Sequence, residues 1–334
     1  MAQTRRPVRW GLLGTGYICS EMAKALALVP DARLAAVGSR DLERAQAFVE
    51  PHALAHPDVR VHARYQSLVD DPQVDVVYIG TPHSEHAAAA RLALTAGKPV
   101  LCEKPFTLNR NEAVGLVALA RERGLFMMEA MWTRFIPAVA EAKRLVDAGE
   151  IGEVVSVQAD FGVASTLPPK HRVFNPALGG GALLDLGVYP LALASYFLGP
   201  VSAAQAVAQL GTTGVDVHTL FNLRHARGGL SQGLCSLRTP TPCQATVYGT
   251  AGRIDLQAPF FHSEHLTLVK PGQAPVERHL PRRGMGYAHQ VAEVHRCLQQ
   301  GWLESRVMPL DESVALMGWL DSMRAQIGLR YPGE

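Results

Sequence analysis

The feature that most constrains this chain is a short apolar run, residues 8–13, followed at once by a glycine turn and a helical pattern. In such a turn Gly14 permits a sharp bend, and Gly16 lets the backbone come close to a pyrophosphate. Residues 18–29 are rich in alanine and leucine and predict a helix whose free N–H groups face the anion. The pattern predicts a dinucleotide-binding loop; the alternative is a glycine turn that binds nothing. The loop residues expected to touch the cofactor are Gly14, Gly16, Tyr17 and Ile18.

One position of this loop departs from the usual motif. The third glycine, which lets the helix pack closely on the preceding strand, is replaced here by Cys19. Cysteine is small and apolar, so we expect the close packing of helix on strand to be kept.

The end of the second expected strand, residues 34–38, indicates which dinucleotide is bound. Enzymes that use NAD tend to place an acidic residue there, which accepts hydrogen bonds from the ribose hydroxyls. This chain has Ser39 and Arg40 instead, and a hydroxyl with a guanidinium suits a 2′-phosphate. We therefore expect NADP rather than NAD, the alternative being that Arg40 is only a surface charge. Asp41 is expected to cap the next helix.

Two further polar clusters follow expected strands, at residues 81–86 and 103–105. Strands that alternate with helices predict a parallel sheet, and ligands bind outside the carboxyl ends of its strands. The cofactor residues expected at these ends are Thr81, Pro82, His83, His86, Glu103 and Lys104. The two histidines have a spacing that can chelate a metal, but no third ligand pattern accompanies them. Hydride transfer to NADP also needs no metal, so none is expected.

Composition limits the remaining classes of function. The length of 334 residues suits two domains, for which we expect the ranges 1–128 and 129–334. The net charge of +2 gives no bulk attraction to nucleic acid or to a membrane, and the longest apolar stretches fall short of a membrane span. The five cysteines are scattered without a paired motif, so neither a disulfide framework nor a zinc site is expected. A cytoplasmic location is the default.

The second half of the chain predicts an α+β domain. Strand-like runs occur at 153–161 and repeatedly between 203 and 269, separated by turn residues. A glycine run at 179–181 opens a helix expected to extend from about 182 to 198. Two late helices, 287–300 and 310–327, are expected to pack against the sheet of this domain.

Four segments carry a resemblance to a known family. They are GLLGTGYIC at 11–19, EKP at 103–105, EAMWTRF at 129–135 and GGGALLDLGVYP at 179–190. In this order and at these separations they resemble the family of glucose-fructose oxidoreductase, inositol dehydrogenase and rhizopine catabolism proteins, Gfo/Idh/MocA. Within it, EAMWTRF and the tyrosine at 189 are most similar to the dimeric dihydrodiol dehydrogenases and the NADP-dependent D-xylose dehydrogenases. Many other relatives carry histidine at that position.

The resemblance implies a fold and an assembly. The first domain would be a doubly wound parallel Rossmann sheet, and the second an α+β domain with a large, open, mostly antiparallel sheet that carries helices on one face. The other sheet face would form a subunit contact, so a homodimer or a higher homo-oligomer is expected.

The resemblance also implies a chemistry, in which hydride passes between the nicotinamide and a hydroxyl carbon. Asp185 and Tyr189 lie four residues apart on the predicted helix and therefore on one face of it. Tyr189 is the candidate base; a free phenol has a pKa of about 10, and a nearby ammonium such as that of Lys104 would lower it. Lys104 as the base, with Tyr189 only binding substrate, stays open. Glu103 is expected to position the lysine or to touch the nicotinamide, and Asp185 to orient a substrate hydroxyl or the lysine.

The side chains expected to shape the substrate site are Trp132, Arg134, Phe161, Arg172, Asp185 and Tyr189, and Trp132 is also expected near the cofactor. Core packing at the domain junction is the alternative for the aromatic ones. The sequence thus predicts an NADP-dependent dehydrogenase or reductase acting on CH–OH groups of a sugar, polyol or vicinal dihydrodiol. The competing hypothesis is an NADP-binding sensor or regulatory protein of the same fold without turnover.

Overall fold

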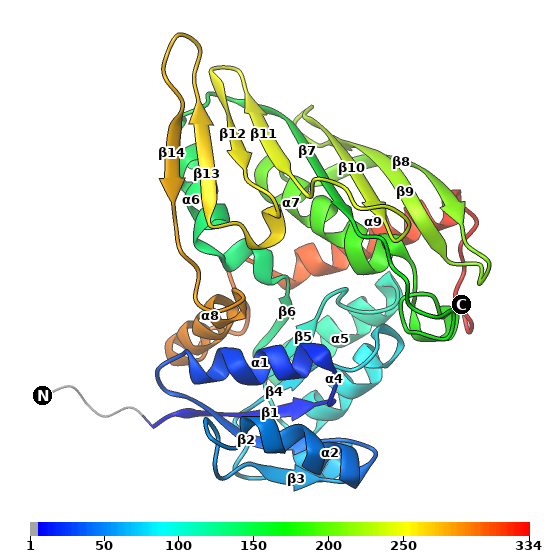
Figure 1. Cartoon of the computed structure of the whole chain (residues 1–334). Coiled ribbons are helices and arrows are strands. Elements are labelled where there is room, and N and C mark those ends of the chain that lie inside the picture. Colours follow the sequence, from blue (N-terminus) through cyan, green and yellow to red (C-terminus); the bar gives the residue numbers. More distant parts are fainter. Residues whose placement is uncertain (1–5) are drawn as a thin grey trace, which may run out of the picture. The chain divides into compact units, whose positions relative to one another are not determined.

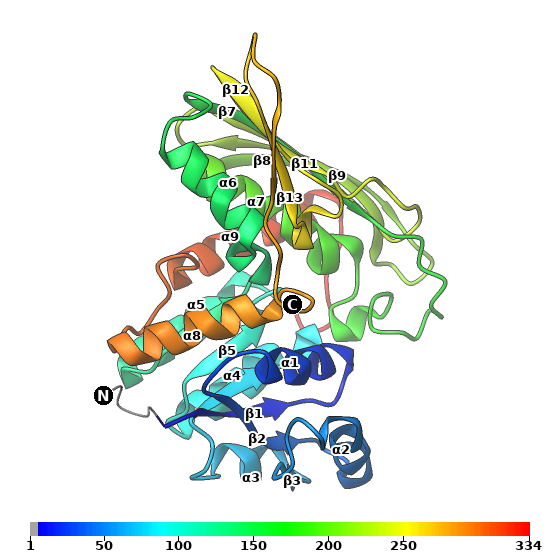
Figure 2. The ribbon, with the colours of Figure 1, turned by 60° about the vertical axis from the view of Figure 1, so that its left-hand side comes forward.

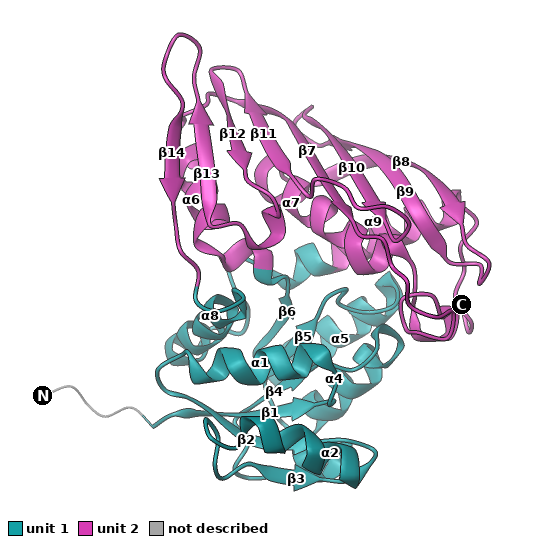
Figure 3. Cartoon of the chain, in the orientation of Figure 1, with its two compact units in different colours: residues 1–132, 283–313 teal, residues 133–282, 314–334 magenta. Residues whose placement is uncertain are grey.

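The computed structural model describes residues 6–334 and divides the chain into two compact units (Figure 3). The first unit contains the residues up to 132 together with 283–313. The second contains residues 133–282 and 314–334. The chain therefore leaves the first unit after residue 132 and returns to it after residue 282.

The first unit is built on a six-stranded, wholly parallel sheet in the order β3-β2-β1-β4-β5-β6 (Figure 1). This confirms the doubly wound sheet expected from the sequence, and its order reverses between β1 and β4, where ligands bind in such folds. The strands are β1 Val8–Leu13, β2 Ala32–Gly38, β3 Arg60–His62, β4 Val76–Ile79, β5 Val100–Glu103 and β6 Met127–Ala130. The short strand β3 was not among the predicted strands.

Helices connect these strands and cover the sheet. They are α1 Tyr17–Ala27, α2 Leu42–Val49, α3 Tyr65–Val69, α4 His86–Thr95, α5 Arg110–Arg123 and α8 Tyr287–Gln300. The carboxylate of Asp41 accepts a hydrogen bond from Arg44 N at 3.2 Å, which confirms its predicted role as the N-cap of α2. Asn109 caps α5 in the same way, through Glu112 N at 3.0 Å.

Helix α8 corrects an expectation, because it belongs to the first unit and not to the sheet of the second. It lies against α1, side by side with it in Figures 1 and 2. Trp10 of β1 donates a hydrogen bond from Nε1 to His295 Nε2 at 3.0 Å. Burial lowers the pKa of His295, which keeps the imidazole neutral and able to accept this bond. The apolar stripe of α8 predicts burial but does not specify the surface that buries it.

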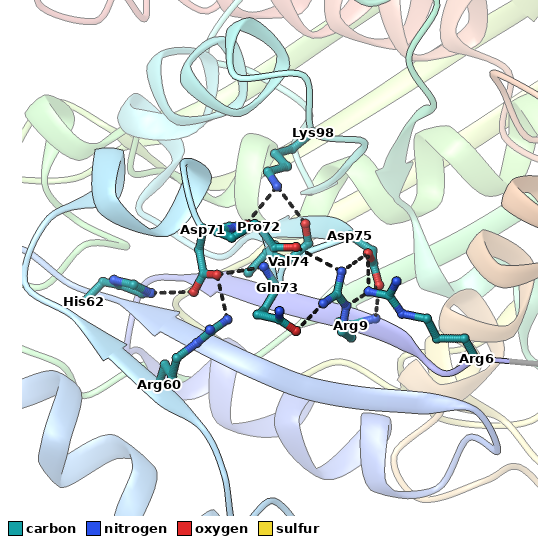
Figure 4. Close-up of polar contacts among 10 residues, drawn as sticks. All are labelled: Arg6, Arg9, Arg60, His62, Asp71, Pro72, Gln73, Val74, Asp75 and Lys98. Atoms are coloured by element: carbon teal, nitrogen blue, oxygen red, sulfur yellow. Dashed lines mark hydrogen bonds and ion pairs between the residues drawn. The ribbon is translucent and has the colours of Figure 1, made fainter.

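The amino ends of the same strands are joined by a network of charged groups (Figure 4). Asp71 accepts hydrogen bonds from Arg60 at 2.6 Å and from Gln73 N at 2.8 Å, and lies 3.0 Å from His62 Nε2. Lys98 donates to the carbonyl oxygens of Asp71 and Val74 at 2.9 and 2.8 Å.

A second part of this network surrounds Asp75, at the start of β4. Its carboxylate accepts two hydrogen bonds from the Arg9 guanidinium, at 2.9 and 2.6 Å, and one from Arg9 N at 2.9 Å. Although burial opposes ionisation of both carboxyls, their hydrogen bonds outweigh it and lower the pKa of Asp71 and of Asp75.

The second unit is built on an eight-stranded sheet in the order β14-β13-β12-β11-β7-β10-β9-β8. Among the strands of this sheet within residues 6–334, β7 and β10 pair in parallel and the other neighbours antiparallel, which confirms the expected, mostly antiparallel sheet. The strands are β7 Val154–Gly162, β8 Val201–Leu210, β9 Asp216–His225, β10 Leu230–Ser236, β11 Ala245–Gly249, β12 Gly252–Leu256, β13 His265–Val269 and β14 Val276–His279.

Helices cover one face of this sheet. Helix α7, Val188–Leu198, packs on β7 and β10, and α6, Pro137–Asp147, packs on β12 and β13 (Figure 1). Helix α9, Leu310–Gln326, begins in the first unit and continues into the second, where Gln326 bonds the backbone of β8. On the opposite face, Val207 and Leu220 are paired neighbours in the sheet and are 68% and 36% exposed.

One helical stretch corrects the expectation that no apolar run reaches the length of a membrane span. Within residues 6–334, Pro176–Leu198 is long and apolar enough to cross a membrane, judged by length and composition alone. However, 89% of its most apolar window is buried inside the protein, as in the core helix of a globular domain. Its apolar character therefore matches the interior that it occupies.

Candidate active site

The glycine loop after β1 has the geometry of a phosphate loop. Gly14 adopts φ +116, a conformation that side chains disfavour, and a Cβ there would come within 2.8 Å of the Gly80 carbonyl oxygen. Gly16 is the N-cap of α1, and none of the described residues lies within 4 Å of the place its Cβ would take. Tyr17, the first residue of α1, is 74% exposed. The first turn of the helix is thus open to an anion.

Cys19 keeps the close packing that its position requires. Its side chain is fully buried, and Sγ lies 3.8 Å from Leu13 O and 3.6 Å from Gly80 O. A Cβ at Gly80 would overlap this sulfur atom. The usual motif makes room for this packing with a glycine on the helix. Here the helix carries Cys19, and the glycine that makes the room is Gly80, at the end of the neighbouring strand β4.

Ser39 and Arg40 follow β2, and they have different surroundings. Ser39 is buried, and its hydroxyl accepts a hydrogen bond from Asp41 N at 3.2 Å. The Arg40 side chain is 71% exposed, and its guanidinium lies 3.9 Å from the Glu85 carboxylate. An exposed ion pair of this kind is weak, so the guanidinium remains available to a stronger anion. Glu85, in the loop after β4, was not among the predicted site residues.

The loop after β4 contains a hydroxyl without a hydrogen-bond partner among residues 6–334, that of Thr81, and a histidine whose two ring nitrogens both face carbonyl oxygens, His86. Thr81 is buried, and among residues 6–334 its hydroxyl has no hydrogen-bond partner. A buried hydroxyl is costly to leave unpaired, so this position fits a ligand that supplies the partner. Pro82 and His83 follow, and the His83 ring lies 5.7 Å from the His86 ring.

His86 has a different position from the one expected for a residue lining the crevice. It has no exposed surface, and its ring nitrogens lie 2.8 Å from Pro105 O and 3.0 Å from Thr81 O. Burial lowers its pKa to about 3, so the neutral ring donates to one of these carbonyls at a time. His86 therefore ties the loop after β4 to the loop after β5 and presents no group to a ligand.

Glu103 and Lys104 end β5, and the Lys104–Pro105 peptide is cis. The Glu103 carboxylate is buried and accepts a hydrogen bond from the Tyr78 hydroxyl at 2.6 Å. It also accepts one from Lys104 N at 3.2 Å. Burial raises the pKa of Tyr78 well above its ordinary value, so Tyr78 remains a donor. Tyr78 was missed in the sequence, where its only signal is one hydroxyl within the apolar strand β4.

Trp132 follows β6, and its indole is almost fully buried. Its ring centroid lies 4.5 Å from that of Tyr287, the first residue of α8. The sequence did not indicate Tyr287, because this residue reaches the first unit only through the returning segment 283–313. Among residues 6–334, no group of three histidine, cysteine or acidic side chains has the geometry of a metal site.

Of the substrate residues expected in the second unit, Phe161 contacts Tyr189. This tyrosine is 6% exposed, and its ring lies 5.3 Å from Phe161 of β7 and 5.8 Å from Phe261. The two phenylalanine rings are parallel at 3.9 Å. Thr133 holds the Phe261 backbone by a hydrogen bond from its hydroxyl to the carbonyl oxygen at 3.2 Å. Phe261 was missed because it lies in a single 3₁₀ turn, Phe260–His262, between β12 and β13, which no sequence motif marks.

Asp185 pairs with Arg172, which brings two predicted residues together. The guanidinium donates to Asp185 Oδ1 at 3.1 Å, and the carboxylate is the more buried partner. Asp185 stands in a π-helical turn, Leu183–Gly187, so the predicted helix from 182 to 198 is not one regular α-helix. A π-turn closes over i→i+5 rather than i→i+4. Four residues still span about one turn in either geometry, so the common face of Asp185 and Tyr189 stays a prediction.

The position of Arg134 differs from the one expected for a residue that shapes the substrate site. It is 2% exposed, donates a hydrogen bond to Ala192 O at 2.8 Å and lies 4.8 Å from the centroid of the Tyr196 ring. Both contacts are with α7, so Arg134 braces that helix from inside the second unit and does not form a substrate wall. A sequence shows the charge of an arginine but not the backbone carbonyls that bury it.

Several known proteins match this chain over nearly its whole length. Trans-1,2-dihydrobenzene-1,2-diol dehydrogenase of Bos taurus is 38% identical over 338 residues, which covers 98% of this chain and 99% of that protein. The Homo sapiens protein of the same name is 34% identical, with the same coverage. A 3-ketoreductase from Actinomadura kijaniata, solved in complex with NADP and TDP-benzene, has a TM-score of 0.85 and 28% identity, and the match covers 96% of this chain and 98% of that chain.

Two family models match consecutive parts of the sequence. The oxidoreductase family with an NAD-binding Rossmann fold matches residues 8–131, the region that contains all six strands of the first sheet. The GFO/IDH/MocA C-terminal domain matches residues 139–255, which include Tyr189. The chain belongs to the Gfo/Idh/MocA family of oxidoreductases with an NAD-binding Rossmann fold.

Proposed function

We propose that this oxidoreductase transfers hydride between NADP and a hydroxyl carbon of a cyclic vicinal diol or a related sugar or polyol. The observation that carries the proposal is the pair of stacked phenylalanines, Phe161 and Phe261, beside the buried Tyr189. A phenol surrounded by aromatic faces suits a hydroxyl borne on an apolar ring. Identity of 38% over nearly the full length to a dihydrodiol dehydrogenase supports the same substrate class.

The choice of NADP rests on the end of β2. Arg40 is exposed and only loosely paired with Glu85, and the chain has no acidic residue at positions 39 and 40. An arginine can hold a 2′-phosphate with two charge-assisted hydrogen bonds. The open turn at Gly16 suits the pyrophosphate, and the buried hydroxyl of Thr81 suits a ligand acceptor or donor.

When bound, the nicotinamide supplies the hydride acceptor or donor, and the protein has to move a proton. We propose Lys104 and Tyr189 for this task, in either of the two assignments that the sequence leaves open. The Tyr78 hydroxyl fixes the Glu103 carboxylate by a hydrogen bond. This carboxylate accepts a hydrogen bond from Lys104 N and so holds the backbone at Lys104. Asp185, held by Arg172, is proposed to accept a hydrogen bond from a second substrate hydroxyl.

The test is a turnover assay on the purified protein, followed by NADPH absorbance. A panel of trans-dihydrodiols, aldoses and polyols is offered with NADP, and the corresponding carbonyl compounds with NADPH. The proposal predicts turnover with at least one cyclic diol and a higher kcat/KM with NADP than with NAD. Tight NADP binding without turnover on the whole panel would instead favour the sensor hypothesis.

We further propose that the chain forms a homodimer through the outer face of the second unit's sheet. The paired, exposed side chains of Val207 and Leu220 favour burial there. Sedimentation should give a dimer mass, and Leu220→Glu should shift it toward the monomer; a monomeric wild-type protein would contradict the proposal. The five cysteines are all free and buried, which is compatible with the cytoplasmic location we propose.

A further inference from the structure

The glycine turn that precedes Asp185 is held by buried polar groups from distant parts of the second unit. The Tyr331 hydroxyl donates a hydrogen bond to Gly180 O at 2.5 Å. Leu183 N, in the first turn after the glycines, donates to Asp216 Oδ2 at 2.8 Å. Neither Asp216 nor Tyr331 belongs to the motifs that pointed to the active site.

Asp216 lies at the start of β9 and has no exposed surface. Its Oδ2 accepts a second hydrogen bond from the Thr219 hydroxyl at 2.6 Å. A Cβ at Gly181 would overlap Asp216 Oδ1, and Gly181 adopts φ +126, so this glycine has no replacement that fits over the carboxylate. Burial raises the pKa of Asp216 to about 6, which shows that the fold retains this acid at a cost.

Tyr331 is itself fixed. It is 2% exposed, and its backbone N donates to Glu334 Oε2 at 3.0 Å. The Arg324 guanidinium lies 4.7 Å from the centroid of the Tyr331 ring and donates to Glu334 and Asp321, each at 2.7 Å. The segment that follows α9 is thus held by part-buried ion pairs of Arg324, and the Tyr331 ring packs against the same guanidinium.

The opposite side of the glycine turn contacts the loop that carries Arg172. A Cβ at Gly180 would lie 2.8 Å from Arg172 O, and Gly181 N donates to Val173 O at 2.9 Å. The same loop presents the Arg172 guanidinium to Asp185. The turn is therefore enclosed between the Arg172 loop on one side and Asp216 with Tyr331 on the other.

We propose that Asp216 and Tyr331 are positioning residues for the reaction, which set the place of Asp185 and Tyr189 by fixing the glycine turn before them. This inference rests on the proposed function of the same site. A π-turn follows the glycines, and its i→i+5 bonds replace the i→i+4 ladder of a regular α-helix. The hydrogen bonds of Asp216 to Leu183 N and of Tyr331 to Gly180 O fix the backbone at the start of this turn.

The test compares three variants under the assay described above. Tyr331→Phe removes one hydroxyl, and Asp216→Leu removes both acceptor bonds; each should lower kcat by about tenfold or more while the KM for NADP stays unchanged. Asp216→Asn is the matched control, since the amide oxygen can still accept from Leu183 N and Thr219. Its kcat should stay within about twofold of the wild type.

Amide hydrogen exchange of residues 179–189 gives a second readout that needs no turnover. Exchange in this segment should accelerate in Tyr331→Phe but not in Asp216→Asn, with the rest of the second unit unchanged. Unchanged kcat and unchanged exchange in Tyr331→Phe and Asp216→Leu would overturn the inference, as would a loss that merely follows the unfolded fraction. If the wild type shows no turnover, the proposed function fails, and faster exchange in Tyr331→Phe would then support only the fixing of the turn.

Discussion

The two ends of the parallel sheet in the first unit contain similar types of charged residue but differ in how far these residues are paired with one another. At the amino end, Asp71 and Asp75 each accept several hydrogen bonds from neighbouring cations and backbone N–H groups (Figure 4). At the carboxyl end, Arg40 is mostly exposed, and the turn at Gly16 is open. Charges that satisfy one another stabilise the fold, whereas charges with unused capacity are suited to a ligand.

Lysine occurs at both ends, and the two lysines should separate catalysis from stability most strongly. Lys104→Met should lower kcat by about 10²–10⁴-fold, because it removes the charge proposed to take part in proton transfer, with NADP affinity largely kept. Lys98→Met should leave kcat unchanged but lower the free energy of unfolding by about 1–3 kcal/mol, since two carbonyl oxygens lose their donor. Turnover assays, NADP titration and denaturant unfolding of both variants check this. A kcat retained in Lys104→Met would remove Lys104 from the mechanism.

Two arginine variants, one at each end of the sheet, make a second comparison of ligand binding with stability. Arg40→Ala should weaken NADP binding by about 10–100-fold and NAD binding little, because only NADP carries the 2′-phosphate. Arg9→Ala should leave both affinities unchanged and destabilise the fold, because Asp75 loses its bidentate partner. Fluorescence titrations with both cofactors measure the effect. Equal losses for NADP and NAD in Arg40→Ala would mean that Arg40 does not read the phosphate.

The packing under the phosphate loop gives a smaller effect. Gly80→Ala should lower the free energy of unfolding by about 1–3 kcal/mol, since the added methyl group overlaps Cys19 Sγ. The double variant with Cys19→Gly should recover part of this loss, because it removes the sulfur atom that the added methyl group would overlap. Denaturant unfolding of the two single variants and the double variant measures the coupling. Strictly additive losses would show that the sulfur is not the obstacle.

The weakest effect should come from pH. The pKa values of Asp71 and Asp75 are lower in the folded chain than their usual 3.8, so their contribution is present above that value. It is lost as pH falls through the lower, folded values. The free energy of unfolding should therefore fall more steeply with acidification below about pH 4 in the wild type than in Asp75→Asn. Identical slopes for the two proteins would contradict the role given to this network.

Local patterns predicted much of the fold and part of the site. The glycine turn before α1, the Asp41 cap and the parallel sheet follow from short-range sequence rules, and the structure confirms their geometry. Features that depend on distant partners were not predictable in this way. Arg134 gives no sign that Ala192 O buries it, and Tyr78 gives none of its bond to Glu103.

The π-turn was missed for a related reason. The run from 182 to 198 is apolar on all sides and fits an α-helix as well as any other buried helix. The Cys235 sulfur lies 3.0 Å from the place of a Cβ at Gly187, so the end of this turn leaves little room for a side chain, and the apolar pattern does not show this contact.

The return of residues 283–313 has a consequence for anyone who divides or recombines this protein. A piece ending at residue 132 would contain every strand of the first sheet but would lack α8, leaving Trp10 without His295 and the apolar side of α1 uncovered. We expect such a piece to aggregate, and a graft of 283–313 through a linker to rescue it. Exchange of the second unit between relatives would likewise need three junctions, near residues 132, 283 and 313, so that each unit is inherited as a pair of segments.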